Sequence, residues 1–245
     1  MAHALRKLAP DVWVFPHDRQ QKRIQPAVGI ICTPRQTVLV DGGNSPNHAQ
    51  RIRAALRSID APPVSLVIYT HHHWDHVFGA CVYGVPAIGH ELCRDRLLQQ
   101  AALPWSRAYL REQVRRNPLL KISYGALDRA IKDWSDFRII VPQTSFSQRM
   151  RLQLDGLAIE LEHVGGWHAV DSIVVRIPHA RVMFLGDCFY PSLPQDGAER
   201  KGIAWSMLAA LQDRSVDLYV HGHGAPLKRS KMLSWTVKLL ARMRG

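Results

Sequence analysis

The sequence predicts an α/β protein, and three observations lead to that fold class. Short apolar runs rich in β-branched residues alternate with helical patterns along the 245 residues, which is typical of a mixed α/β fold rather than of separate all-α and all-β parts. Hydrophobic residues make up 47% of the chain, enough for a sizeable core. The pair Asp155-Gly156 predicts a hairpin, because this dipeptide suits the positive φ angles of a tight two-residue turn.

The predicted elements follow from these patterns in chain order. Strands are expected at Val12–Phe15, Ala27–Thr33, Thr37–Asp41, Ser65–Thr70, Val85–Gly89, Arg138–Val141, Arg151–Leu154, Leu157–Glu162, Ser172–Ile177, Arg181–Gly186 and Asp217–Val220. Helices are expected at Pro46–Ser58, Glu91–Ala101, Trp105–Arg116, Ala126–Asp133, Arg200–Gln212 and Ser230–Arg242.

The stretch from about Glu91 to Asp136 is mostly helical and interrupts an otherwise sheet-forming chain. We therefore interpret residues 1–245 as one domain with a helical cap inserted at about 91–136. Basic side chains are frequent in this insert, and they could face an acidic substrate or form an ordinary solvated helix surface. They are Arg94, Arg96, Arg107, Arg111, Arg115, Arg116 and Lys121.

Charge, hydropathy and cysteine spacing give expectations about where the protein is located and what it binds. A formal net charge of +12 would attract anions in general and selects none of them. No apolar run approaches the length of a membrane span, and the first residues lack the apolar stretch of a signal peptide, so we expect a cytoplasmic protein with no membrane span. The basic amphipathic segment Ser230–Arg242 fits a membrane-surface helix or, more often, a terminal helix covering the sheet. The four cysteines are scattered singly, which favours free thiols.

A dense histidine motif carries most of the functional signal. The apolar run Ser65–Tyr69 leads directly into Thr70-His71-His72-His73-Trp74-Asp75-His76, so these side chains lie at a strand end. Packing four imidazoles without a metal would leave many ring nitrogens desolvated. Imidazole nitrogen and carboxylate oxygen are common zinc ligands. We expect His71 and His73 to reach one ion, and Asp75 and His76 to reach a second.

Further ligands are expected later in the chain, because one short segment cannot complete two sites. Three later strands end on suitable residues: Val164-Gly165-Gly166-Trp167-His168, Phe184-Leu185-Gly186-Asp187 and Val220-His221-Gly222-His223-Gly224. Each pattern is weak alone, since strand-terminal Asp and Gly-His are frequent turn residues. Their order after the histidine motif strengthens the prediction of a metal centre.

The order His-x-His-x-Asp-His, Gly-x-His, Gly-Asp and Gly-His-Gly resembles that of the metallo-β-lactamase superfamily, from about Val12 to Pro226 outside the insert. The resemblance implies an αββα sandwich of two sheets with helices outside. It also implies two zinc ions, with His71, His73 and His168 holding the first and Asp75, His76 and His223 the second. Asp187 would bridge the two ions, and Asp41 in Leu39-Val40-Asp41-Gly42-Gly43 would support the site without being a ligand.

Two positions depart from the family pattern. His221 stands where relatives commonly have proline, so it is a rival to His223 as the ligand, although His223 aligns with the Gly-His-Gly motif. His72 occupies a variable position and is expected to point away from the metals.

The resemblance implies a hydrolase in which hydroxide on the metal pair attacks a carbonyl of a small ester, lactone or thioester, with β-lactams and phosphodiesters as further substrate classes. Asp75 would orient the nucleophile, and Tyr190 could donate to the oxyanion or simply pack as an aromatic. The basic insert favours an anionic small-molecule substrate, and the sequence has no recognisable nucleic-acid-binding module. Iron or manganese could replace zinc.

The sequence does not determine the oligomeric state. It also leaves two rival functions open. One is a mononuclear iron dioxygenase resembling persulfide dioxygenases, which would use only His71, His168 and Asp187. The other is a basic binding protein with a vestigial site, against which the intact ligand set argues.

Overall fold

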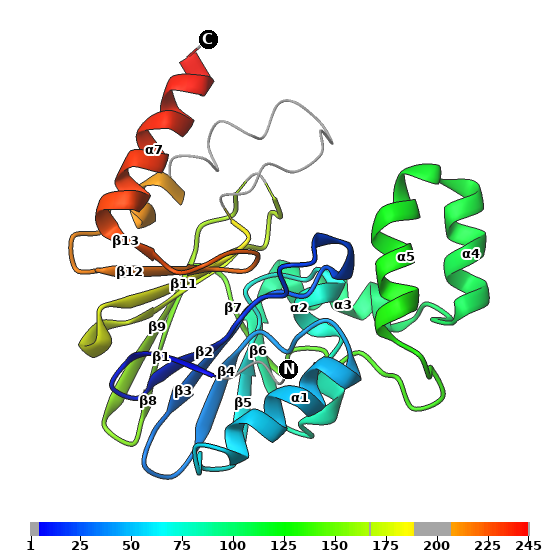
Figure 1. The fold of residues 1–245 in the computed structure, drawn as a ribbon, viewed down its shortest axis with the longest axis horizontal. Coiled ribbons are helices and arrows are strands. Elements are labelled where there is room, and N and C mark those ends of the chain that lie inside the picture. The colour runs from blue at the N-terminus through cyan, green and yellow to red at the C-terminus, as the bar shows by residue number, and fades with distance from the viewer. Residues whose placement is uncertain (1–4, 167, 189–206, 245) are drawn as a thin grey trace.

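The computed structural model describes residues 5–166, 168–188 and 207–244, and these contain two β-sheets (Figure 1). The first sheet has the strand order β1-β2-β3-β4-β5-β6-β7, antiparallel from β1 to β4 and parallel from β4 to β7. The second has the order β13-β12-β11-β10-β9-β8 and is antiparallel except between β11 and β12. The strands are β1 Arg6–Ala9, β2 Val12–Phe15, β3 Val28–Cys32, β4 Thr37–Val40, β5 Val64–Ile68, β6 Ala87–His90, β7 Thr144–Phe146, β8 Arg149–Leu154, β9 Leu157–His163, β10 Ile173–Ile177, β11 Val182–Gly186, β12 Leu218–His221 and β13 Leu227–Lys228.

Helices flank both sheets. Residues 207–211 are also helical, and 3₁₀ turns occur at η1 Gln21–Arg23, η2 Ala80–Val82, η3 Pro118–Leu120 and η4 Pro178–Ala180. The α-helices are α1 Pro46–Arg57, α2 Trp74–Val77, α3 Glu91–Ala101, α4 Arg107–Arg116, α5 Lys121–Ala130 and α7 Arg229–Arg244. None of the helices in the described residues is long and apolar enough to cross a membrane.

Alternation along the strands divides the core into layers. In β11, Val182 and Phe184 belong to the core between the sheets, whereas Met183 and Leu185 belong to the core under residues 207–211 and α7. The outer face of the first sheet is covered by α1, α3, α4 and α5. This arrangement follows from the two-residue period of a strand, which sends successive side chains to opposite faces. The predicted α/β class and αββα sandwich are confirmed.

Local sequence signals account for several element boundaries. Ser45 caps α1 by accepting a hydrogen bond from the His48 backbone N–H at 3.2 Å, and Pro46 occupies the first helical position. The predicted hairpin is confirmed, since Asp155 and Gly156 have φ angles of 51° and 86° between β8 and β9. All four cysteines are free thiols, as expected.

Two predicted elements are wrong in position, and three strands were not predicted. Residues 138–141 are irregular rather than a strand: Ile139, Ile140 and Val141 pack against the core under the helices, and the strand forms only after Pro142, as β7. The helix expected at 126–133 is α5, which begins at Lys121 directly after η3 and ends where buried Ile131 becomes extended. The short edge strands β1 and β13 were missed together with β7, as was α2. One domain with an inserted cap stays a prediction.

Candidate metal centre

The histidine motif lies on the connection between β5 and α2, at the carboxyl end of a buried parallel strand. His73 has extended backbone angles and is the N-cap of α2, the short helix that carries Asp75 and His76. The first two histidines therefore project from extended chain, and Asp75 and His76 project from a helical turn. This change of backbone separates the motif into two sets of side chains.

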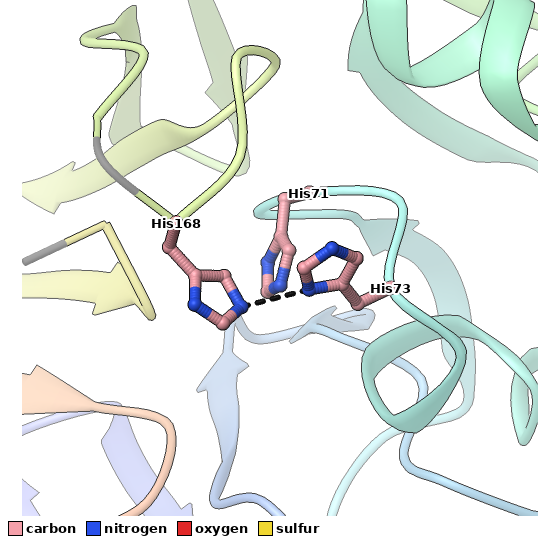
Figure 2. Close-up of side chains that lie close together, drawn as sticks. All are labelled: His71, His73 and His168. Carbon is pink, nitrogen blue, oxygen red and sulfur yellow. Dashed lines mark hydrogen bonds between the residues drawn. The ribbon is translucent and has the colours of Figure 1, made fainter. Parts of the chain in front are cut away.

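The first set consists of His71, His73 and His168, whose nitrogens lie close enough together to hold one ion. Figure 2 shows the three rings pointing toward one another, two from the β5–α2 connection and one from the loop between β9 and β10. Nδ1 of His73 lies 2.7 Å from Nε2 of His168, and the His71 ring centroid lies 4.6 Å and 5.1 Å from those of His73 and His168. Three imidazoles at such spacing form a nitrogen donor set suited to zinc.

The second set consists of Asp75, His76, Asp187 and His223. Asp187 follows β11 and His223 follows β12, so this set is built at the ends of two adjacent parallel strands and on α2. Nε2 of His223 lies 3.0 Å from Asp75 Oδ2 and 3.2 Å from Asp187 Oδ2. Nε2 of His76 lies 3.4 Å and 3.5 Å from the same two carboxylate oxygens.

Asp187 lies between the two sets. Its Oδ2 is 3.6 Å from Nε2 of His168 in the first set and within 3.5 Å of both histidines in the second. Among the described residues, no other carboxylate oxygen comes within 4 Å of ring nitrogens from both sets. The structure therefore brings all seven predicted ligand side chains together, with Asp187 at the centre.

Several buried polar atoms of the two sets have no hydrogen-bond partner, and this bears on which ligand the sets can bind. In the described part of the chain, Nε2 of His71, Nε2 of His76 and Oδ1 of Asp187 are buried and accept or donate no hydrogen bond. Burying such groups unsatisfied is costly, and metal ligation is one way to satisfy them. The donor types and their spacing fit divalent cations in both sets.

Asp41 supports the site through hydrogen bonds to Thr70 and His76. It accepts hydrogen bonds from the backbone N–H of Thr70 at 2.8 Å and from the Thr70 hydroxyl, and its Oδ2 lies 2.7 Å from Nδ1 of His76. A carboxylate bonded to Nδ1–H fixes the tautomer in which Nε2 of His76 faces the second set. Asp41 lies in the position that the sequence motif predicts for a supporting residue.

A second supporting carboxylate, Asp171, was not predicted. It is fully buried and accepts hydrogen bonds from the backbone N–H and from Nδ1 of His72, at 2.8 Å and 2.7 Å. His72 belongs to neither ligand set, in agreement with the expectation that it points away. Its contact with Asp171 ties the β5–α2 connection to the β9–β10 loop that carries His168. No local pattern in the sequence distinguishes Asp171 from an ordinary loop aspartate.

Burial keeps the first set neutral. Desolvation, followed by the neighbouring histidines, lowers the pKa of His73 to about 3 and that of His71 well below its ordinary value. Desolvation also lowers the pKa of His168, against the opposing carboxylate of Asp187. Neutral imidazole is the form that ligates a metal, so these three side chains are held in the binding-competent state.

In the second set, the carboxylates have the largest influence on the pKa values of the histidines. Burial opposes the charged form of His223, but the hydrogen bonds and charges of Asp187 and Asp75 outweigh it and raise the pKa of His223 to about 9. In the same way Asp41, Asp75 and Asp187 together overcome burial and raise the pKa of His76 well above its usual range. Burial raises the pKa of Asp187, but His76 and His223 outweigh it and hold that pKa well below its ordinary value. When no metal is bound, two cationic histidines therefore compensate the buried carboxylates around them.

This balance predicts a pH dependence for the stability of metal-free protein. The pKa of His223 is raised from 6.5 to about 9, so its stabilising contribution is complete below pH 6.5 and is lost as the pH rises through 9. We expect the melting temperature of chelator-treated protein to fall by roughly 5 °C between pH 6.5 and 9.5, after allowance for solvent screening of a partly exposed ring. Thermal denaturation followed by circular dichroism measures this change.

A matched pair of histidine variants provides the control. His223→Gln should flatten the fall, whereas His221→Gln should retain it, because burial lowers the pKa of His221 to about 4 and keeps that ring neutral over the whole range. An equal pH dependence in both variants would contradict the assignment of the effect to His223.

The two rival histidines at the end of β12 occupy different places. His221 is the last residue of β12, is buried and lies outside both ligand sets, whereas His223 joins the second set. Gly222 between them allows this, because a β-carbon there would collide with Oδ1 of Asp187 and the His76 ring. Tyr190, the predicted oxyanion donor, lies outside the described residues.

A cavity of about 820 Å³ opens onto both ligand sets. Its walls include residues of the β2–β3 loop, and also Trp74 and Ser123, where the Trp74 indole N–H donates to the Ser123 hydroxyl at 2.9 Å. Since Ser123 belongs to α5, the helical insert forms part of one wall. The lining residues are His17, Asp18, Arg19, Ile24, Gln25, His73, Trp74, Asp75, Ser123, His168, Asp187 and His223. Sequence patterns did not identify the β2–β3 loop as part of the site, because it has neither strand nor helical periodicity.

The basic cluster of the insert does not line this cavity. All seven of its side chains are exposed, and in Figure 1 α4 and α5 form a helical pair at one end of the molecule. Arg107 pairs with Asp128 at 2.7 Å, and Arg115 and Arg116 both pair with Glu112. The solvated-surface alternative therefore describes these residues. The arginine that lines the cavity is Arg19, from the β2–β3 loop.

Residues 22–82, which include the histidine motif, match the family model of the metallo-beta-lactamase superfamily. In an alignment of 220 residues that covers 81% of this chain, it is 25% identical to a linear primary-alkylsulfatase from Pseudomonas sp. (strain ATCC 19151). The match covers 41% of that enzyme, so the chain spans about two fifths of the length of this curated relative.

Solved structures show the same architecture. A metallo-beta-lactamase from Pontibacter korlensis superposes with a TM-score of 0.64 at 18% identity, covering 95% of this chain and 96% of that one. The sec-alkylsulfatase Pisa1 from Pseudomonas sp. gives 0.67 at 16% identity, covering 96% of this chain and 40% of that one. A metallo-beta-lactamase family protein from Thermus thermophilus gives 0.66 at 17%, covering 97% and 82%. At these identities the likeness concerns the fold.

Proposed function

The chain is a protein of the metallo-β-lactamase fold, and from this premise we propose that it is a metal-dependent hydrolase with two cations held by the seven gathered side chains. The observation that carries the proposal is the pair of donor sets that meet at Asp187, the first of three imidazoles and the second of mixed imidazole and carboxylate groups. His71, His73 and His168 would hold one ion, Asp75, His76 and His223 the other, and Asp187 would bridge them. Zinc suits both sets, with iron or manganese as alternatives.

A bound cation pair would lower the pKa of a water molecule and polarise the carbonyl of a substrate. The protein's own groups supply the rest of the chemistry. Burial of His71 and His73 keeps each ring neutral, with one nitrogen unprotonated, and Asp41 orients His76. Asp75 lies at the cavity beside His223 and would orient the attacking nucleophile.

The substrates we propose first are small esters, lactones and thioesters. A cavity of about 820 Å³ is within the range of small-molecule sites. Trp74 and Ile24 provide apolar lining, and Asp75, Asp187 and His223 provide polar lining.

Sulfate esters are a second candidate substrate class, because both the curated relative and one of the superposed structures are named as alkylsulfatases. Both of those proteins are longer than this chain, which covers 41% of one and 40% of the other. Sulfate-ester cleavage therefore needs its own measurement.

Metal quantification followed by a chromogenic substrate panel tests the proposed function. We expect about two zinc ions per chain, and metal-dependent hydrolysis of at least one carboxylic ester, lactone or thioester in a panel that also contains a sulfate ester, a β-lactam and a phosphodiester. Activity should disappear on chelation and return with zinc. One iron per chain with oxygen uptake would instead identify a dioxygenase using His71, His168 and Asp187.

A further inference from the structure

We propose that Arg19 binds a carboxylate carried by the substrate, away from the bond that is cleaved, so that the enzyme prefers anionic esters. The inference rests on the proposed hydrolase function and names the substrate class for the same cavity. Arg19 lines that cavity together with Asp75, Asp187 and His223 of the second ligand set.

The loop that carries Arg19 is braced against the rest of the protein. It connects β2 to β3 and is closed by the hydrogen bond from the Asp18 backbone N–H to the Gln25 carbonyl at 3.0 Å. From outside, the Asn44 amide donates to the Ile24 carbonyl at 2.9 Å, and Arg129 of α5 donates to the Lys22 carbonyl at 3.0 Å. The position of Arg19 at the cavity is thus held by groups from two other parts of the fold.

The neighbouring carboxylate is already engaged. Asp18 accepts a hydrogen bond from the backbone N–H of Gln20 at 2.8 Å and pairs with Arg23 at 2.9 Å, and its side chain is only 6% exposed. No ion pair within 4 Å involves Arg19 in the parts of the chain that the structure describes. Arg19 is therefore an exposed residue that lines the cavity, and its charge is not compensated by a direct carboxylate contact.

The chemistry of the cavity selects a carboxylate-bearing ester. A guanidinium presents a planar fork of N–H donors that matches the two oxygens of a carboxylate. The apolar surfaces of Ile24 and Trp74 can accommodate a short carbon chain between the two polar ends. A substrate with a reactive carbonyl at one end and a carboxylate at the other would place the carbonyl at the ligand sets and the carboxylate at Arg19.

Two esters with the same leaving group test this inference: neutral 4-nitrophenyl acetate and the mono-4-nitrophenyl ester of glutaric acid. In Arg19→Ala the ratio of kcat/KM for the anionic over the neutral ester should fall about tenfold, mainly through KM, as expected for loss of one charge-assisted interaction at a partly exposed site. Arg19→Lys should recover part of the ratio. Arg111→Ala is the matched control, because Arg111 is an exposed arginine outside the cavity, and its ratio should equal that of the wild type.

Direct binding separates this inference from the proposed function. The 4-nitroanilide of glutaric acid resists hydrolysis, and calorimetry should give about tenfold weaker binding to Arg19→Ala than to wild type. If the metal-loaded wild type cleaves neither ester, the proposed function fails, while the anilide still tests Arg19. If both esters are cleaved but the ratio and the anilide affinity are the same in Arg19→Ala as in wild type, the inference about Arg19 is overturned and the hydrolase assignment stands. A ratio that falls only in Arg111→Ala would move anion binding to the insert and also overturn it.

Discussion

Asp187→Ala is expected to lose bound metal and to reduce turnover on the order of a thousandfold. Among the described residues, Asp187 is the carboxylate that reaches both ligand sets, with Oδ2 3.6 Å from His168 Nε2 and 3.2 Å from His223 Nε2. Its removal deprives each set of a shared oxygen ligand and leaves two cationic histidines with less compensation. Metal content after dialysis and steady-state rates on the best ester of the panel measure the two effects.

The control for this variant is Asp128→Ala in α5, which removes a carboxylate that pairs with Arg107 and does not line the cavity. It should keep both metal content and turnover at wild-type levels. Circular dichroism should show that Asp187→Ala remains folded, since the substitution leaves the hydrophobic cores of the sandwich intact. Retention of two ions and of the wild-type rate by Asp187→Ala would contradict a bridging role.

Asp41→Asn is expected to lower metal affinity about 10- to 100-fold at the second ligand set only. The carboxylate holds Nδ1 of His76 at 2.7 Å and thereby fixes which ring nitrogen faces the metal. An amide could donate to Nδ1 instead, which would place the proton on Nε2 and disable that ligand. At limiting zinc we therefore expect about one ion per chain in the variant and about two in the wild type, measured by titration with a metal indicator.

Asp171→Asn is the comparison for Asp41→Asn. Asp171 is also buried and also supports a histidine, but that histidine is His72, which belongs to neither ligand set. Its replacement should lower thermal stability while leaving the stoichiometry at about two ions. A loss of the same single ion in both variants would show that the effect comes from general loosening of the loops, contrary to a tautomer role for Asp41.

The sequence could predict the ligand residues because the segment that carries each of them begins at the end of an apolar strand. The end of a buried strand is a local property, readable from composition, and parallel strands such as β11 and β12 end at the same edge of a sheet. His71, Asp187 and His223 were identifiable on that basis. A strand end does not separate His221 from His223, and the Gly-His-Gly pattern favoured His223. The structure adds the physical reason, which is the close approach of Gly222 to Asp187 across two strands.

Positions set by long-range packing were predicted less well. Residues 138–141 have the composition of a strand, yet their apolar side chains are used to cover the core beneath the insert, and the Ile140 carbonyl accepts a hydrogen bond from Tyr69 at 2.9 Å instead of a strand partner. Likewise, a sequence motif identified Asp41 as a supporting residue but no local pattern identified Asp171, and only the fold shows which histidine each supports.

The sequence by itself determined the α/β class, most strand positions and the donor types available for a metal pair, because these depend on periodicity and on residue chemistry within a few positions. The two donor sets and the central place of Asp187 were already implied by the sequence motifs and the family resemblance. The tertiary structure decided which carboxylate supports which histidine and which arginine lies at the cavity. The insert carries most of the conspicuous arginines, but Arg19 reaches the cavity because the β2–β3 loop is pinned there by Asn44 just before α1, by α5 and by its own backbone contacts. Distances between segments so far apart in the chain are set by the packing of the two sheets and the helices around them, which no local pattern encodes.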